Sequence, residues 1–152
     1  MKPEIVNLPA MRVVGLSYVG KNENLEIPAM WGAFNPRFGE IQQEGKACYG
    51  LCLPKPEDAE TGAFEYVACT AATTNAPIPP GMVEKHVPAH KYAKFKHVGA
   101  PHLVHQTFHK IYSEWLPENG LVADGGYDLE LYDEDFMPAS GEPVMYVLVP
   151  IK

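Results

Sequence analysis

Residues 8–20 read LPAMRVVGLSYVG, and residues 87–99 read VPAHKYAKFKHVG. The two stretches align without a gap when Leu8 is set over Val87, and four positions carry the same residue: Pro9 and Pro88, Ala10 and Ala89, Val19 and Val98, Gly20 and Gly99. β-Branched and aromatic residues dominate both stretches and favour a strand. The same strand occurring twice indicates an internal duplication.

Further matches continue the repeat along the chain. Tyr49, Leu51 and Leu53 recur as Tyr127, Leu129 and Leu131, and the pair Tyr66 and Val67 recurs as Tyr146 and Val147, in each case within one position of the register set by Leu8 and Val87. Separate segments that agree so closely in order and register are typical of a duplicated supersecondary unit. We therefore expect a single domain over residues 1–152, with internal repeats at approximately 1–76 and 80–152.

Each repeat is predicted to contain a strand, a helix and two further strands. Residue type and apolar spacing predict the strands at 11–19, 47–53 and 64–70 in the first repeat and at 91–98, 127–132 and 144–149 in the second. Helical spacing covers 27–41, where Pro36 should interrupt the helix, and 104–115. The expected class is α+β, in which two pseudo-twofold-related repeats form an antiparallel sheet with both helices on one face.

The alternation of side chains along 127–132 divides this strand into two faces. Leu129 and Leu131 point one way, and Asp128, Glu130 and Tyr132 point the other. We expect the leucines to lie beneath a helix. Glu130 would then face a ligand cleft along the join between the repeats, on the face of the sheet opposite the helices.

Composition and charge narrow the classes of partner. Of the 152 residues 46% are apolar and 20% are charged, as in ordinary globular domains, and the formal net charge of −7 opposes binding to phosphate backbones. No apolar run approaches the ~18 residues that span a bilayer. We expect no direct nucleic-acid contact, no membrane insertion and a cytoplasmic location.

Motifs for metal, cofactor or covalent chemistry are missing from the sequence. The three cysteines lack metal-ligand or redox spacing, and His102, His105 and His109 lie along one predicted helix without the Glu or Cys of a zinc motif. No nucleophile elbow and no phosphate-binding glycine loop is present. We expect no metal and no cofactor.

Several segments together resemble the GyrI-like small-molecule-binding domains. In chain order they are IPAMWGAF at 27–34, FEYVACTA at 64–71, IYSEWLPENG at 111–120, YDLELY at 127–132 and MYVLVPI at 145–151. The resemblance covers essentially the whole chain. It implies the effector-binding domain of multidrug-responsive transcription activators, in which a glutamate and several aromatic rings hold bulky, often cationic, aromatic compounds.

The resemblance also implies a set of site residues. Glu130 matches the ligand-binding glutamate, Tyr146 matches a pocket tyrosine of the last strand, and Trp31, Tyr66 and Tyr112 are candidate pocket aromatics. Tyr66 and Tyr146 occupy matching places in the repeats, so we expect their rings to face each other across the cleft. From the residues alone, a solvated strand glutamate is the favoured interpretation of Glu130, and it is the resemblance that favours the ligand-binding one.

Three functions follow as hypotheses. The first is a stand-alone module, without a helix-turn-helix segment, that captures bulky hydrophobic, cationic or aromatic drugs or metabolites. The second, implied by a hydrolytic branch of the family, is an enzyme that opens strained cyclopropane-bearing natural products, with Glu130 acting on water and Tyr146 as acid or orienting group. The third is a protein-interaction modulator such as a gyrase inhibitor. A protein partner or a homodimer is left open.

Overall fold

Strands β3 (Gln43–Leu53) and β7 (Asp128–Tyr132) pair across the middle of the sheet and mark the centre of the duplication. The computed structural model describes residues 2–53, 63–100, 103–133, 136 and 143–152. In β3–β7, Leu51 lies directly opposite Leu129, its own counterpart in the repeat. The pseudo-twofold axis that relates the repeats therefore passes through this pair. His102 lies outside the described residues.

The sheet has eight strands in the order β1-β6-β8-β7-β3-β4-β2-β5, and every adjacent pair is antiparallel. Their bounds are β1 Glu4–Leu8, β2 Met11–Gly20, β3 Gln43–Leu53, β4 Phe64–Ala72, β5 Val83–Val87, β6 His90–Val98, β7 Asp128–Tyr132 and β8 Val144–Pro150. The six strands expected from sequence are present. The α+β class with two related repeats is confirmed.

Two edge strands, β1 and β5, were not predicted, and the two halves exchange them. β1 pairs with β6 of the second half, where Leu8 lies opposite His90, and β5 pairs with β2 of the first half, where Val87 lies opposite Met11. The two pairings are equivalent under the repeat, which sets Leu8 over Val87 and Met11 over His90. Each half therefore completes the sheet of the other, which ties the halves into one unit.

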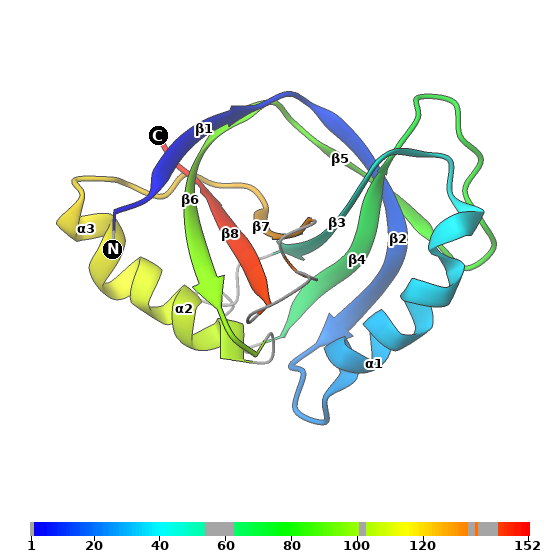
Figure 1. Cartoon of the computed structure of the whole chain (residues 1–152), viewed down its shortest axis with the longest axis horizontal. Helices are drawn as coiled ribbons and strands as arrows, with labels where there is room; N and C mark the ends of the chain where they lie inside the picture. The colour runs from blue at the N-terminus through cyan, green and yellow to red at the C-terminus, as the bar shows by residue number, and fades with distance from the viewer. Residues whose placement is uncertain (1, 54–62, 101–102, 134–135, 137–142) are drawn as a thin grey trace.

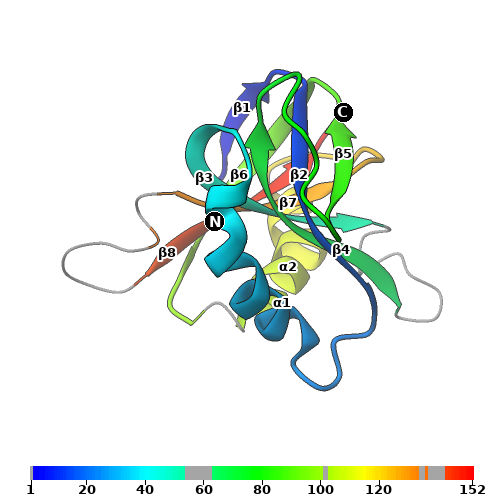
Figure 2. The ribbon, with the colours of Figure 1, turned by 90° about the vertical axis from the view of Figure 1, so that its right-hand side faces the viewer.

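The helices lie on the outer face of a curled sheet (Figures 1 and 2). They are α1 Glu26–Phe34, the 3₁₀ helix η1 Asn35–Glu40, α2 Val104–Lys110, the π-helix η4 Ile111–Trp115 and α3 Leu116–Glu118. Pro36 sits where α1 gives way to η1, as expected, because proline cannot donate the next helical hydrogen bond. No helix in the described part of the chain is long and apolar enough to cross a membrane.

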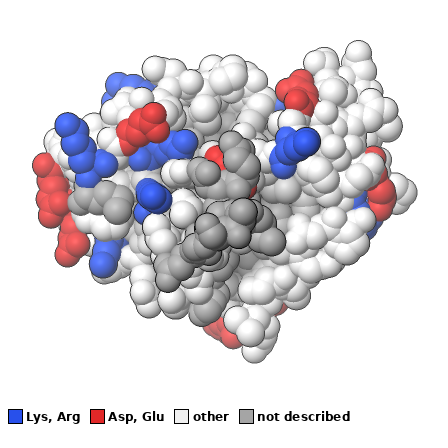
Figure 3. Space-filling model, viewed as in Figure 1, with Lys and Arg blue, Asp and Glu red and all other residues white. Residues whose placement is uncertain are grey.

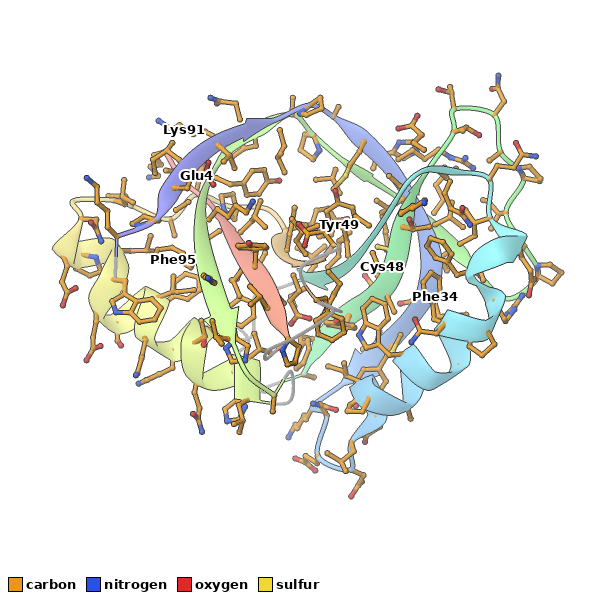
Figure 4. The ribbon with its side chains drawn as sticks, in the orientation of Figure 1. Glu4, Phe34, Cys48, Tyr49, Lys91 and Phe95 are labelled. Atoms are coloured by element: carbon orange, nitrogen blue, oxygen red, sulfur yellow. The ribbon has the colours of Figure 1, made fainter. Side chains whose placement is uncertain are left out.

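Three apolar clusters fill the fold. One, to which every strand contributes, lies inside the curl and includes Leu51, Tyr92 and Leu129. The other two lie on the outer face, one beneath α1 around Phe34 and one beneath α2 and η4 around Phe95 (Figure 4). The sheet is thus apolar on both surfaces. The seam β3–β7 separates the two outer clusters and leaves a place between the helices for polar side chains.

Candidate functional site

Two buried carboxylates of β7 lie on the helix side of the seam. Asp128 is 0% exposed and Glu130 is 5% exposed, whereas the intervening Leu129 belongs to the cluster inside the curl. The expectation that Leu129 and Leu131 lie beneath a helix, with Glu130 on the face opposite the helices, is therefore wrong. Alternation separates the faces correctly, but both faces of this sheet bury apolar residues, so an apolar side chain does not identify the helix side.

Hydrogen bonds from the first half and from its own strand hold Glu130 in place. The hydroxyls of Tyr66 and Tyr132 both donate to Oε1 of Glu130, at 2.6 and 2.8 Å, and Nε1 of Trp31 in α1 donates to the Tyr66 hydroxyl at 3.0 Å. Oε2 of Glu130 accepts no hydrogen bond from the residues that the structure describes. This second oxygen is the acceptor that the described hydrogen bonds leave unused.

Gly50 makes room for this network. It lies opposite Glu130 in the β3–β7 ladder, and a Cβ at this position would stand 2.1 Å from the Tyr66 hydroxyl oxygen and 2.8 Å from Oε1 of Glu130. Neither approach is compatible with van der Waals radii. A glycine here is therefore a condition for the contact between Tyr66 and Glu130.

A row of aromatic rings extends from α1 towards β7. The Trp31 ring meets Tyr132 edge-on at a centroid distance of 5.0 Å, and Tyr132 meets Phe136 in the same manner at 4.8 Å. All three side chains are half-buried. Edge-to-face rings of this kind are mutually stabilising and still offer π surface to an occupant.

The second half contributes a different carboxylate contact. Tyr112, on the π-helix η4, donates its hydroxyl to Asp128, with 2.8 and 2.7 Å to the two carboxylate oxygens. π-Helical turns are rare and are frequent at functional sites. Each half therefore links an aromatic residue of its helix to a carboxylate of β7. Tyr112 donates directly to Asp128, whereas Trp31 is linked to Glu130 through the Tyr66 hydroxyl.

Burial and the neighbouring charges set the electrostatics of the site. Burial raises the pKa of Glu130, as does the neighbouring Asp128, while the two tyrosine hydroxyls act in the opposite direction. Burial first, and then Glu130, raises the pKa of Tyr66 and Tyr132 well above the ordinary phenol range, so both stay neutral donors. Within the described ranges no Lys, Arg or His forms an ion pair with Glu130. A buried carboxylate without a cation is costly, and a cationic ligand removes that cost.

Four of the five predicted site residues meet on the helix side: Trp31, Tyr66, Tyr112 and Glu130. Tyr146 does not join them, because it belongs to the cluster inside the curl, where Lys94 lies 4.2 Å from its ring centroid.

The prediction that the Tyr66 and Tyr146 rings face each other across a cleft is wrong. The sequence alignment of the two repeats differs from the structural one by one residue at these strands. Val67 lies opposite Leu51, and Leu148 lies opposite Leu129, so the structural counterpart of Val67 is Leu148 rather than the Val147 expected from sequence. A shift of one residue moves a side chain to the other face of the sheet.

Three residues of the site were not predicted as ligand-binding: Asp128, Tyr132 and Phe136. The alternation of Asp128, Glu130 and Tyr132 along one face of the strand was the signal that could have found the first two. Phe136 carries no such periodic signal, and only its contact with Tyr132 places it here.

Charge on the outer surface is mixed. On the face shown in Figure 3, the Lys and Arg side chains of the described residues lie beside Asp and Glu rather than forming a continuous basic surface. Among the ion pairs are Arg12 with Glu84 and Lys85 with Glu65. This pattern does not resemble the basic surface of a nucleic-acid-binding domain.

A duplicated antiparallel sheet with two outer helices, and with carboxylates and aromatic rings gathered between them, defines a small-molecule-binding domain. The chain belongs to the GyrI-like small molecule binding domain family, whose profile matches residues 1–152.

Known proteins resemble this chain in sequence and in fold. It is 39% identical over 138 residues to the transcriptional regulator BrlR of Pseudomonas aeruginosa, a stretch that covers 90% of this chain and 50% of the regulator. The chain thus spans about half the length of that relative.

Two solved structures share the fold at low sequence identity. The structure of SAV2435 bound to tetraphenylphosphonium superposes with a TM-score of 0.72 at 18% identity, and covers 100% of this chain and 94% of that one. A hydrolase from Listeria innocua superposes with a TM-score of 0.63 at 12% identity, and the superposition covers 99% of this chain and 92% of the hydrolase chain.

Proposed function

We propose that this protein binds bulky hydrophobic organic cations between its two helices, with Glu130 as the counter-charge. The observation that carries the proposal is the buried Glu130 carboxylate, which neutral hydroxyls hold and for which the described residues supply no cation. Oε2 is the oxygen that meets the ligand. Direct contact with nucleic acid is not part of the proposal, in keeping with the net charge of −7.

The aromatic residues give the site its preference for organic rather than inorganic cations. Trp31, Tyr132 and Phe136 present half-buried rings beside Glu130. A cation over such a ring gains about 0.5–2 kcal/mol, and the apolar body of a large cation gains further through burial. The solved fold neighbour bound to tetraphenylphosphonium supports this class of ligand.

Calorimetric titration with tetraphenylphosphonium tests the proposal. We expect Glu130→Gln to weaken binding at least tenfold, which corresponds to about 1.4 kcal/mol, because glutamine keeps the size and the acceptor for Tyr66 but loses the charge. Glu114→Gln, at an exposed position of η4, removes a charge elsewhere and is the matched control.

Tetraphenylborate has nearly the same shape as tetraphenylphosphonium and the opposite charge, and we expect it not to bind. Equal affinity of Glu130→Gln and the parent protein for the phosphonium would contradict the assignment of Glu130. Equal affinity for the two tetraphenyl ions would contradict charge recognition altogether.

A hydrolytic use of the same site is our second candidate. The specific observation is the raised pKa of the buried Glu130, since a carboxyl shifted towards neutrality suits a general base that takes a proton from water. Tyr146 has no part in it, because its side chain lies on the other face of the sheet. The hydroxyls of Tyr66 and Tyr132 are the neighbouring donors in its place.

Incubation with a cyclopropane-bearing alkylating compound separates this candidate from binding alone. Turnover would give a product heavier by one water in mass spectrometry, and Glu130→Gln should abolish it. Unchanged compound after long incubation, under conditions where calorimetry shows it bound, would rule out hydrolysis of that compound.

A further inference from the structure

The two carboxylate oxygens of Glu130 are not equivalent. Oε1 accepts hydrogen bonds from the hydroxyls of Tyr66 and Tyr132, at 2.6 and 2.8 Å, whereas Oε2 accepts none from the residues that the structure describes. The indole N–H of Trp31 is already used, because it donates to the Tyr66 hydroxyl. The carboxylate therefore has one oxygen that these side chains saturate and one that they do not.

We propose that Oε2 makes the site selective for organic cations that carry an N–H group, which are protonated amines, over fully substituted onium ions of the same size and charge. The inference rests on the proposed function and refines it, because it names the class of cation that Glu130 holds best. Glu130 then acts as a hydrogen-bond acceptor for the ligand as well as a counter-charge.

Burial makes the unused oxygen costly. Glu130 is buried, and a carboxylate oxygen that is closed off from water without a donor carries the full cost of its lost hydration. A quaternary cation compensates the charge, but its carbon substituents keep its nitrogen away from Oε2 and offer no polar hydrogen. An ammonium N–H donates to Oε2 at about 2.7–2.9 Å, as charge-assisted hydrogen bonds do, and such a bond is stronger in a buried site than in water.

Hydration of the ligand acts in the opposite direction. A protonated amine gives up a hydrogen bond to water when it enters the site, and a quaternary cation has no such bond to lose. The N–H of the amine regains a charged acceptor in the site, whereas Oε2 beside a quaternary cation regains no donor. The balance favours the amine, because only the amine satisfies both its own N–H and Oε2.

The tyrosines fix which oxygen faces the ligand. Tyr66 is fully buried with its hydroxyl held between Trp31 and Oε1, and Tyr132 donates to the same oxygen. In Glu130→Gln the amide carbonyl takes the place of Oε1, because both hydroxyls donate to it, and the NH₂ group takes the place of Oε2. Glutamine therefore presents a donor where glutamate presents an acceptor, and an N–H of the ligand meets another donor.

Two isomeric cations test the inference by calorimetric titration at pH 7. Protonated para-phenylbenzyl(ethyl)methylamine and para-phenylbenzyltrimethylammonium have the same elemental composition, charge and aromatic body, and only the first carries an N–H. We expect the N–H isomer to bind the parent protein at least tenfold more tightly, which corresponds to about 1.4 kcal/mol. Glu130→Gln should bring the affinity ratio of the two isomers to one or below, whereas the control Glu114→Gln should leave it unchanged.

The outcomes separate this inference from the proposed function. Equal affinity of the two isomers for the parent, with both weakened in Glu130→Gln, would overturn the role of Oε2 and leave the proposed function standing. Absence of binding by both isomers and by tetraphenylphosphonium would overturn both. A preference for the N–H isomer that survives in Glu130→Gln would overturn the assignment to Oε2.

Proton NMR of the bound amine gives a second readout, which decides the matter if Glu130→Gln binds neither isomer measurably. In the parent complex we expect the ammonium N–H resonance to shift downfield from that of the free cation and the proton to be protected from exchange with solvent. An N–H that exchanges as fast as in the free amine would overturn the hydrogen bond to Oε2.

Discussion

Gly50→Ala should break the site by a steric conflict at one atom. The added Cβ would stand 2.1 Å from the Tyr66 hydroxyl oxygen and 2.6 Å from the ring carbon that bears it, so the tyrosine must withdraw from Glu130. Withdrawal removes a 2.6 Å hydrogen bond to a buried carboxylate, and the acceptor of the Trp31 N–H moves with it. The perturbation therefore acts on stability and on ligand binding together.

The expected cost adds two terms. Overpacking of a filled site costs about 1–3 kcal/mol, and loss of a hydrogen bond to a charged group costs about 1.5–3 kcal/mol. We therefore expect the free energy of unfolding to fall by about 3 kcal/mol or more. For a domain of this length that lowers the melting temperature by about 6–12 °C.

Urea unfolding of the parent protein and four variants tests this cost. Gly45→Ala, on the same strand, is the matched control, because no atom lies within 4 Å of the added Cβ, and we expect it to change stability by about 0.5 kcal/mol or less. Tyr66→Phe removes the nearer clashing atom and the hydrogen bond that withdrawal would break, although the ring carbon at 2.6 Å remains, so Gly50→Ala should cost at least about 1 kcal/mol less in that background than in the parent. If Gly50→Ala is as stable as Gly45→Ala, or if the cost is additive with Tyr66→Phe, the steric reasoning is refuted.

Three further perturbations test other parts of the structure. Tyr66→Phe by itself should lower the free energy of unfolding in urea by about 1–3 kcal/mol, because it leaves the Trp31 N–H without its acceptor and removes one donor to Glu130. A decrease below about 0.5 kcal/mol would argue against the hydrogen-bond network. Glu130→Gln should raise the melting temperature at pH 7. The pKa of this carboxyl is higher in the folded protein than in the unfolded chain. At pH values between the two, the folded protein therefore binds more protons than the unfolded chain, and the free energy of unfolding falls as pH rises through the folded pKa. The increase in melting temperature of Glu130→Gln over the parent should therefore disappear in acid. An increase that persists in acid would contradict the raised pKa. For the same reason, cation affinity of the parent should decrease as pH falls through the folded pKa of Glu130. Arg12→Gln should lower the urea midpoint without changing cation affinity, since Arg12 donates to Glu84 and to the carbonyls of Thr73 and Ala76, away from β7; a parallel loss of affinity would contradict this.

Local sequence signals located most of the secondary structure. Pro36 marks the end of α1, and aromatic and β-branched runs mark six strands, because these effects act within a few residues. The sequence signals did not predict β1 and β5. Each is five residues long and gains its hydrogen bonds from a strand in the other half of the chain, β6 and β2 respectively, so nothing in their own composition reveals the partner.

The candidate site was predictable in its residue types but not in its orientation. Glu130 and the aromatic residues Trp31, Tyr66 and Tyr112 were identified as candidates, and the structure brings them to one side of the seam. Their place on the helix side was not predictable from alternation, because the opposite face of the curled sheet also buries an apolar cluster. Tyr146 was misplaced for a related reason, since a one-residue difference in register reverses the face.

The sequence by itself determined that this protein is a duplicated α+β domain with an acidic strand near its end, because repetition and alternation are properties of the linear chain. Only the tertiary structure decided which face of that strand meets the helices, that Gly50 admits the Tyr66 hydroxyl to Glu130, and that Asp128 belongs to the same site. These features depend on how strands distant in sequence are registered and how the sheet curls. Both follow from the packing of the whole chain, which no local stretch of sequence contains.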